Sequence, residues 1–175
     1  MMIPEFWEKL VDFLPPGERR SVLDAYYRRL TSNDPEVERE AARRWCRYEI
    51  ASSSLLWTEE VVGLGDKDPD LAYQFARLDS HYAANGCFLK WDTQLLDDVE
   101  KIRHIPATIV QGRYDINCPP GSAWDLHKRW PEAELTIAPA DGHSEVEPGI
   151  RTRLLDATDK YKKLLAQGQQ KTIML

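Results

Sequence analysis

The chain has 175 residues, of which 42% are hydrophobic and 30% are charged, and its formal net charge is −6. This composition is typical of a globular protein with one sizeable core, or with a core and a small appendage. The 29 acidic and 23 basic residues, without a long basic cluster, argue against a nucleic-acid partner and favour small solutes or peptides as ligands.

Membrane and redox signals are weak. The longest apolar stretches, such as residues 105–110, are far shorter than the roughly 20 residues that cross a bilayer. No basic-then-apolar signal segment opens the chain, so we expect a cytoplasmic protein with no membrane partner.

The three cysteines are widely separated and include no Cys-x-x-Cys pair, which disfavours disulfides and a structural metal. No cofactor is implied.

Residues 1–103 have the apolar spacing of helices, and prolines and glycines stand where helices would end. The pattern predicts helices at about residues 5–14, 18–30 and 69–84, and a further helix that begins after Asp34 as its N-cap. Residues 63–70 are expected to form a loop. We therefore expect the first part of the chain to be a small all-helical layer.

Two of these helices carry an apolar stripe followed by a carboxylate. The stripes consist of Val37, Ala41, Trp45 and Tyr48 in one helix, and of Leu71, Phe75, Leu78 and Tyr82 in the other. Glu49 and Asp79 come directly after stripe residues, so both lie at the edge of an apolar face. The spacing alone favours a pair of solvated helix acids.

Residues 104–175 have a different pattern, which alternates strands with helices. It predicts strands at residues 106–112 and 134–138 and helices at residues 119–130 and 148–167. A strand, a helix and a second strand in this order form a parallel pair. Two strands and two helices cannot cover both faces of a parallel sheet, so we expect an α/β fold in which this segment is part of a larger sheet.

A carboxylate and an imidazole follow the two predicted strands. Asp115 follows the first strand and His143 the second, and the carboxyl ends of parallel strands lie at the same edge of a sheet. An aspartate that orients a histidine is the acid–base pair of a catalytic triad, and the order Asp then His is that of α/β-hydrolases. The alternatives are a turn or N-cap aspartate and a surface histidine.

A nucleophile for this pair is not evident. The Gly-x-Ser-x-Gly motif is absent, and residues 142–146 (Gly-His-Ser-Glu-Val) lack the second glycine and follow the wrong strand. Cys118 could in principle act as a thiolate beside His143.

Several motifs in the right order carry a resemblance to a known family. They lie at residues 112–119 (Gly-Arg-Tyr-Asp-Ile-Asn-Cys-Pro), 123–135, 142–144 (Gly-His-Ser), 147–150, 75–82, 44–49 and 3–7. With these motifs the sequence closely resembles the proline iminopeptidases, also called prolyl aminopeptidases, which are serine peptidases of the α/β-hydrolase fold. The resemblance implies that residues 1–103 form the helical cap and residues 104–175 the last part of the hydrolase core.

The resemblance implies a peptidase that removes N-terminal proline from peptides. By position, Asp115 and His143 would be the acid and base of the triad. Glu49 would bind the amino terminus of the substrate together with Asp79, both pointing from the edge of a buried face into a shared cleft. Asp79 is one methylene shorter than the glutamate of the family. Cys118 would line the proline pocket, where a small, weakly polar side chain fits better than a nucleophile.

The chain departs from the family at its beginning. It starts inside the cap, so the early strands, the oxyanion-hole segment and the serine elbow are absent from it, and we expect the 175 residues alone to be close to inactive. The expected partner is the missing N-terminal half of the core, in cis or in trans. The alternatives are another α/β-hydrolase, such as an esterase or epoxide hydrolase, and a non-catalytic remnant or docking fragment.

Overall fold

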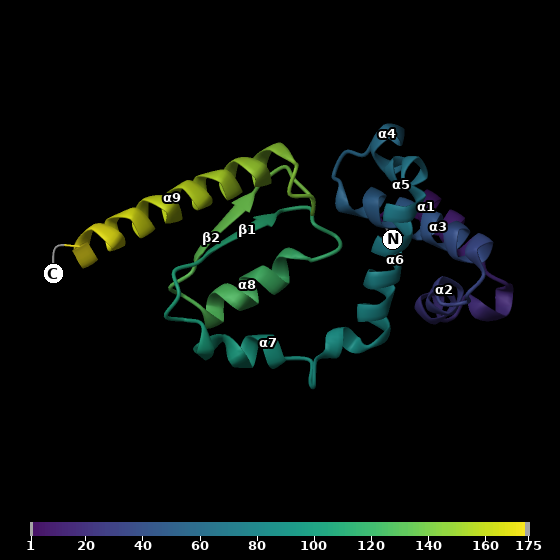
Figure 1. Ribbon diagram of the computed structural model, residues 1–175, viewed down its shortest axis with the longest axis horizontal. Helices are drawn as coiled ribbons and strands as arrows, with labels where there is room; N and C mark the ends of the chain where they lie inside the picture. Colours follow the sequence, from purple (N-terminus) through teal and green to yellow (C-terminus); the bar gives the residue numbers. More distant parts are fainter. Residues whose placement is uncertain (1, 174–175) are drawn as a thin grey trace. The chain divides into compact units, whose positions relative to one another are not determined.

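A computed structural model describes the backbone of residues 2–173 and the side chains of residues 2–166. The chain forms two compact units that divide between Gln94 and Leu95 (Figure 1). Across the described residues, no helix is both long enough and apolar enough to cross a membrane.

The first unit is helical, as predicted. Its helices, in chain order, are α1 (Pro4–Asp12), η1 (Pro16–Glu18), α2 (Val22–Leu30), α3 (Pro35–Ser53), α4 (Glu59–Val62), α5 (Leu64–Lys67), α6 (Pro69–Ala84) and η2 (Gly86–Phe88). Helices α2, α3 and α6 pack against one another, and α1 packs against α3. The short helix α5 lies inside the segment that was predicted to be a loop, so that prediction is wrong at residues 64–67.

Aspartates begin the two longest helices of this unit. The carboxylate of Asp34 accepts hydrogen bonds from the backbone N–H groups of Glu36 and Val37, which confirms the predicted N-cap of α3. Asp68 caps α6 in the same way by accepting from Leu71. Each aspartate is followed by proline, which has no N–H to satisfy at the first helical position.

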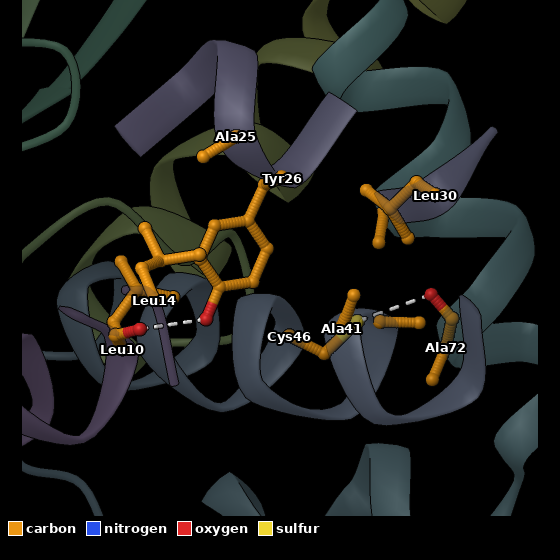
Figure 2. Close-up of a cluster of buried hydrophobic side chains, with 10 residues drawn as sticks. Leu10, Leu14, Ala25, Tyr26, Leu30, Ala41, Cys46 and Ala72 are labelled. Atoms are coloured by element: carbon orange, nitrogen blue, oxygen red, sulfur yellow. Dashed lines mark hydrogen bonds between the residues drawn. The ribbon is translucent and has the colours of Figure 1, made fainter. Parts of the chain in front are cut away.

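The core of the first unit is centred on Tyr26. Figure 2 shows its ring among Leu10, Leu14 and other apolar side chains, and its hydroxyl donates a 2.8 Å hydrogen bond to the carbonyl oxygen of Leu10. Burial raises the pKa of Tyr26 well above its usual value, so the hydroxyl remains a neutral donor. Tyr26 thereby ties α2 to α1.

The buried face of α6 differs from the predicted one. The apolar stripe is exposed; its residues are Leu71, Phe75, Leu78 and Tyr82. The helix instead buries three small side chains, those of Ala72, Ala76 and Ser80. Small side chains let two helix backbones approach closely, and Cys46 of α3 reaches the carbonyl oxygen of Ala72 with its sulfur at 3.3 Å (Figure 2). Close packing against α3 therefore decides which face of α6 is buried.

The second unit holds a parallel pair of strands between two helices. Its elements are α7 (Gln94–Asp97), whose first residue is the last of the first unit, η3 (Asp98–Lys101), β1 (Thr108–Gly112), α8 (Pro120–Arg129), β2 (Glu134–Ala138) and α9 (Pro148–Ile173). The strands are parallel, with a register that runs from Thr108 opposite Glu134 to Gly112 opposite Ala138. Both α8 and α9 pack on the strands, and Figure 1 shows them on either side. The predicted strand–helix–strand–helix order is confirmed.

The segment before β1 belongs to the second unit. Val99 of η3 is buried against Trp130 and Ala133, which lie between α8 and β2. The two compact units thus divide earlier in the chain than the boundary at residues 103/104 that we predict for the cap. That boundary describes where the cap ends, and it stays a prediction.

Candidate active site

The structure brings together the aspartate and the histidine that follow the two strands. Strand β1 ends three residues before Asp115, and β2 ends five residues before His143. His143 Nδ1 lies 3.0 Å from Asp115 Oδ2. The Asp115 side chain is 6% exposed and that of His143 is 40% exposed, so the imidazole is accessible to a ligand and the carboxylate is not.

The carboxylate of Asp115 is held on both of its oxygens. Oδ1 accepts hydrogen bonds from the backbone N–H groups of Asn117 and Cys118, at 3.0 Å and 2.7 Å. Oδ2 accepts from Gln111 Nε2 at 3.3 Å and faces His143. Asp115 is therefore a turn residue and a partner of the histidine at once, and the turn fixes which oxygen the imidazole meets.

This contact determines the tautomer of His143. A carboxylate accepts hydrogen bonds, so the proton of the neutral imidazole lies on Nδ1, next to Asp115 Oδ2. Nε2 then carries the lone pair and can take a proton from a nucleophile. The pair has the arrangement that general-base catalysis requires.

The loop that carries His143 is clamped between β1 and the start of α9. The backbone N–H of Tyr114 donates to the carbonyl oxygen of Asp141 at 2.9 Å. A Cβ atom on Gly112 would overlap the carbonyl oxygen of Gly142, so only glycine permits this approach. On the other side, buried Asp141 accepts a hydrogen bond from Gly149 N in the first turn of α9, at 3.2 Å. We did not predict these contacts from the sequence.

Gln111 is a further residue of the site that the sequence analysis missed. It lies on β1, is only 9% exposed and donates to Asp115. The sequence does contain an indication of this role, because an amide side chain within a run of β-branched residues must find hydrogen-bond partners if the strand is buried.

Cys118 lies next to the carboxylate and is exposed. Partial burial of its sulfur raises the pKa of the thiol, and the charge of Asp115 raises it further. A raised pKa lowers the fraction of thiolate at neutral pH, and the thiolate is the nucleophilic form. The electrostatics thus argue against Cys118 as a nucleophile.

Glu49 and Asp79 lie in the first unit, on the packed helices α3 and α6, and both are half-buried. Trp45 Nε1 donates a 2.8 Å hydrogen bond to Asp79 Oδ2. Burial raises the pKa of the Cys46 thiol to about 12, and the negative charges of Glu49 and Asp79 add to the effect. Both carboxylates are thus near enough to the α3–α6 contact for their charges to act on this buried thiol.

Metal ligands are not clustered in the part of the chain that the structure describes: it contains no group of three His, Cys, Asp or Glu side chains able to hold a metal ion.

Comparison with known proteins finds relatives that share one name. The chain is 48% identical over 163 residues to a proline iminopeptidase of Arabidopsis thaliana, covering 93% of this chain and 43% of the relative. It is 45% identical over 160 residues to a proline iminopeptidase of Xanthomonas citri, covering 91% of this chain and 51% of the relative. A probable proline iminopeptidase of Leptolyngbya boryana is 44% identical over 168 residues, 96% of this chain and 52% of the relative. No protein-family model matches.

These comparisons confirm the resemblance and the fold class expected from the sequence. The chain is homologous to proline iminopeptidases, which are α/β-hydrolases, and its parallel strands with flanking helices agree with the C-terminal part of that fold. It spans about half the length of the curated relatives it matches.

Proposed function

We propose that this chain, a homologue of proline iminopeptidases over nearly all of its length, supplies the cap and the acid–base pair of a peptidase that removes N-terminal proline from peptides in the cytoplasm. Residues 1–103 would form the cap and residues 104–175 the last part of the hydrolase core. The observation that carries the proposal is the 3.0 Å contact between His143 Nδ1 and the buried carboxylate of Asp115.

In the proposed reaction a serine hydroxyl attacks the carbonyl carbon of the N-terminal proline. The serine would come from a Gly-x-Ser-x-Gly elbow in the remaining half of the core, in cis or in trans. His143 Nε2 takes the hydroxyl proton, and Asp115 stabilises the imidazolium that forms. The proton then passes to the nitrogen of the departing peptide as the C–N bond breaks. Water, activated by His143, hydrolyses the acyl-enzyme and releases proline.

Glu49 and Asp79 would bind the amino terminus of the substrate. The protonated nitrogen of an N-terminal proline has two N–H donors and one positive charge, which two carboxylates can satisfy. Trp45 supports this role for Asp79, because its hydrogen bond to Oδ2 orients the shorter carboxylate and leaves Oδ1 to accept from the ammonium. Cys118 would line the pocket for the proline ring.

The proposal is tested by supplying the half of a relative that this chain does not match. We would join the chain to the N-terminal half of its Arabidopsis relative and measure hydrolysis of prolyl, alanyl and N-acetylprolyl p-nitroanilides and of a p-nitrophenyl ester. We expect turnover of the prolyl amide that is abolished by His143→Ala and by a serine reagent, with almost none from the 175 residues alone. Hydrolysis of the ester without preference for free proline would instead indicate another kind of α/β-hydrolase. A folded but inactive chimera would favour a non-catalytic role.

Glu49→Gln should weaken recognition of the free amino terminus in this chimera. Loss of a charge-assisted hydrogen bond costs about 1.5–3 kcal/mol, so we expect kcat/KM for the prolyl amide to fall roughly 10- to 150-fold. Hydrolysis of an ester that has no amino group should change little. The matched control is Glu36→Gln, an exposed glutamate in the first turn of the same helix. Equal losses on both substrates would show that Glu49 does not bind the amine.

A further inference from the structure

The amide of Gln111 faces three hydrogen-bond acceptors at the carboxyl end of β1. Nε2 lies 3.0 Å from the carbonyl oxygen of Cys118, 3.1 Å from that of Gly112 and 3.3 Å from Asp115 Oδ2. All three are oxygens that accept hydrogen bonds. The side chain is buried, so water does not substitute for these partners.

The three acceptors define how the amide is oriented. If the side chain were rotated to exchange its oxygen and nitrogen, the amide oxygen would face two carbonyl oxygens and a carboxylate, which repel it. The NH2 group has two protons for these three acceptors, so Asp115 Oδ2, the most distant of them, shares a proton with one of the backbone carbonyls. In this way Gln111 presents an immobilised donor to the same carboxylate oxygen that faces His143.

We propose that Gln111 is a positioning residue, which holds Asp115 Oδ2 toward His143 Nδ1 and links the acid to the turn that carries Cys118. This inference rests on the proposed roles of Asp115 and His143. The backbone donors of Asn117 and Cys118 bind only Oδ1 and come from the turn that follows Asp115. Gln111 adds a donor on Oδ2 from strand β1, so the orientation of the carboxylate about its Cβ–Cγ bond is set from the sheet as well as from the turn.

The first test uses the chain itself and needs no activity. The Nδ1 proton of His143, hydrogen-bonded to a carboxylate, should give a downfield proton NMR signal that is identified by its loss in His143→Ala. We expect Gln111→Leu to abolish or strongly broaden this signal, because Asp115 Oδ2 loses the donor that holds it toward Nδ1, and the weaker contact no longer protects the proton from exchange with water. Gln111→Met replaces it if the leucine variant does not fold, because methionine also lacks a donor but has a more flexible side chain that adapts to the space.

The matched control is Thr136→Val on the neighbouring strand. The hydroxyl of Thr136 is buried without a hydrogen-bond partner among the described residues, so its removal alters the packing of the sheet without touching Asp115. Thr136→Val should keep the Nδ1 signal. An unchanged signal in the Gln111 variants, or equal loss in Thr136→Val, would overturn the proposal.

A second test separates this inference from the proposed function. In an active chimera, Gln111→Leu should lower kcat at least tenfold and change KM less than threefold, because Gln111 orients the acid and does not touch the substrate. If the chimera is inactive but the NMR results are as expected, the proposed function fails and the role of Gln111 in holding Asp115 stands. If the chimera is active and Gln111→Leu leaves both kcat and the signal unchanged, only the inference about Gln111 fails.

Discussion

Gly112→Ala should displace the loop that carries His143 and destabilise the second unit. The new Cβ would overlap the carbonyl oxygen of Gly142 and lie 2.8 Å from that of Asp141. Both are backbone atoms, and the backbone N–H of Tyr114 already holds Asp141 in place, so the clash cannot be relieved by turning a side chain. Overpacking costs about 1–3 kcal/mol, and we expect a loss near the upper end of that range.

The effect of Gly112→Ala is measured by urea unfolding of the whole chain, with hydrogen exchange of peptides from the second unit to locate the change. Gly121→Ala is the matched control, since a Cβ on Gly121 meets no atom within 4 Å and the residue lies in helix α8. The control should be neutral or more stable by up to about 1 kcal/mol, because alanine favours the helix. Similar stabilities for the two variants would mean that the loop is not clamped as described.

Asp115→Asn should remove nearly all activity from an active chimera while leaving the fold largely in place. The backbone donors of Asn117 and Cys118 would bind the oxygen of the new amide, which turns its NH2 group toward Gln111 and His143. His143 Nδ1 would then face a donor and accept from it, so the proton moves to Nε2 and the base is lost. The same substitution in the chymotrypsin triad lowers kcat about 10⁴-fold, and we expect a fall of roughly 10³- to 10⁴-fold here.

This prediction is checked by steady-state kinetics of the chimera together with its circular dichroism spectrum. Asp125→Asn is the control, because Asp125 is an exposed residue of α8 whose ion pair is with Lys128 on the same helix. It should keep the activity of the unaltered protein. Activity in Asp115→Asn within tenfold of the unaltered protein would argue that Asp115 does not set the tautomer of His143.

The pairing of Asp115 with His143 could be predicted because it depends on two simple features of the sequence. Two strands joined by one helix are parallel, and the residues that follow parallel strands gather at one edge of the sheet. Neither feature requires knowledge of side-chain packing. The contacts of Gln111 and Gly112 depend instead on the distance between neighbouring backbones, which the spacing of residues in the sequence does not give.

The buried face of α6 could not be predicted by hydrophobicity. Periodicity favoured the side with Leu71 and Leu78, each of which is 61% exposed, over the side with Ala72 and Ala76. Large apolar side chains gain more from burial, but small ones permit closer contact between helices, and here the second effect decides the packing. Asp79 lies between the two faces and is half-buried, although the neighbouring stripe is exposed.

The cap of α9 has a consequence for how the site can open. In its first turn the N–H of Gly149 donates to Asp141, a residue eight positions away that belongs to the loop of His143. If that loop leaves its place, the amide of Gly149 loses this acceptor, so movement of the imidazole weakens the start of the helix. The stability of the first turn of α9 and the position of the proposed base are therefore coupled, and the packing of α9 on the strands contributes to the free energy that keeps His143 in position.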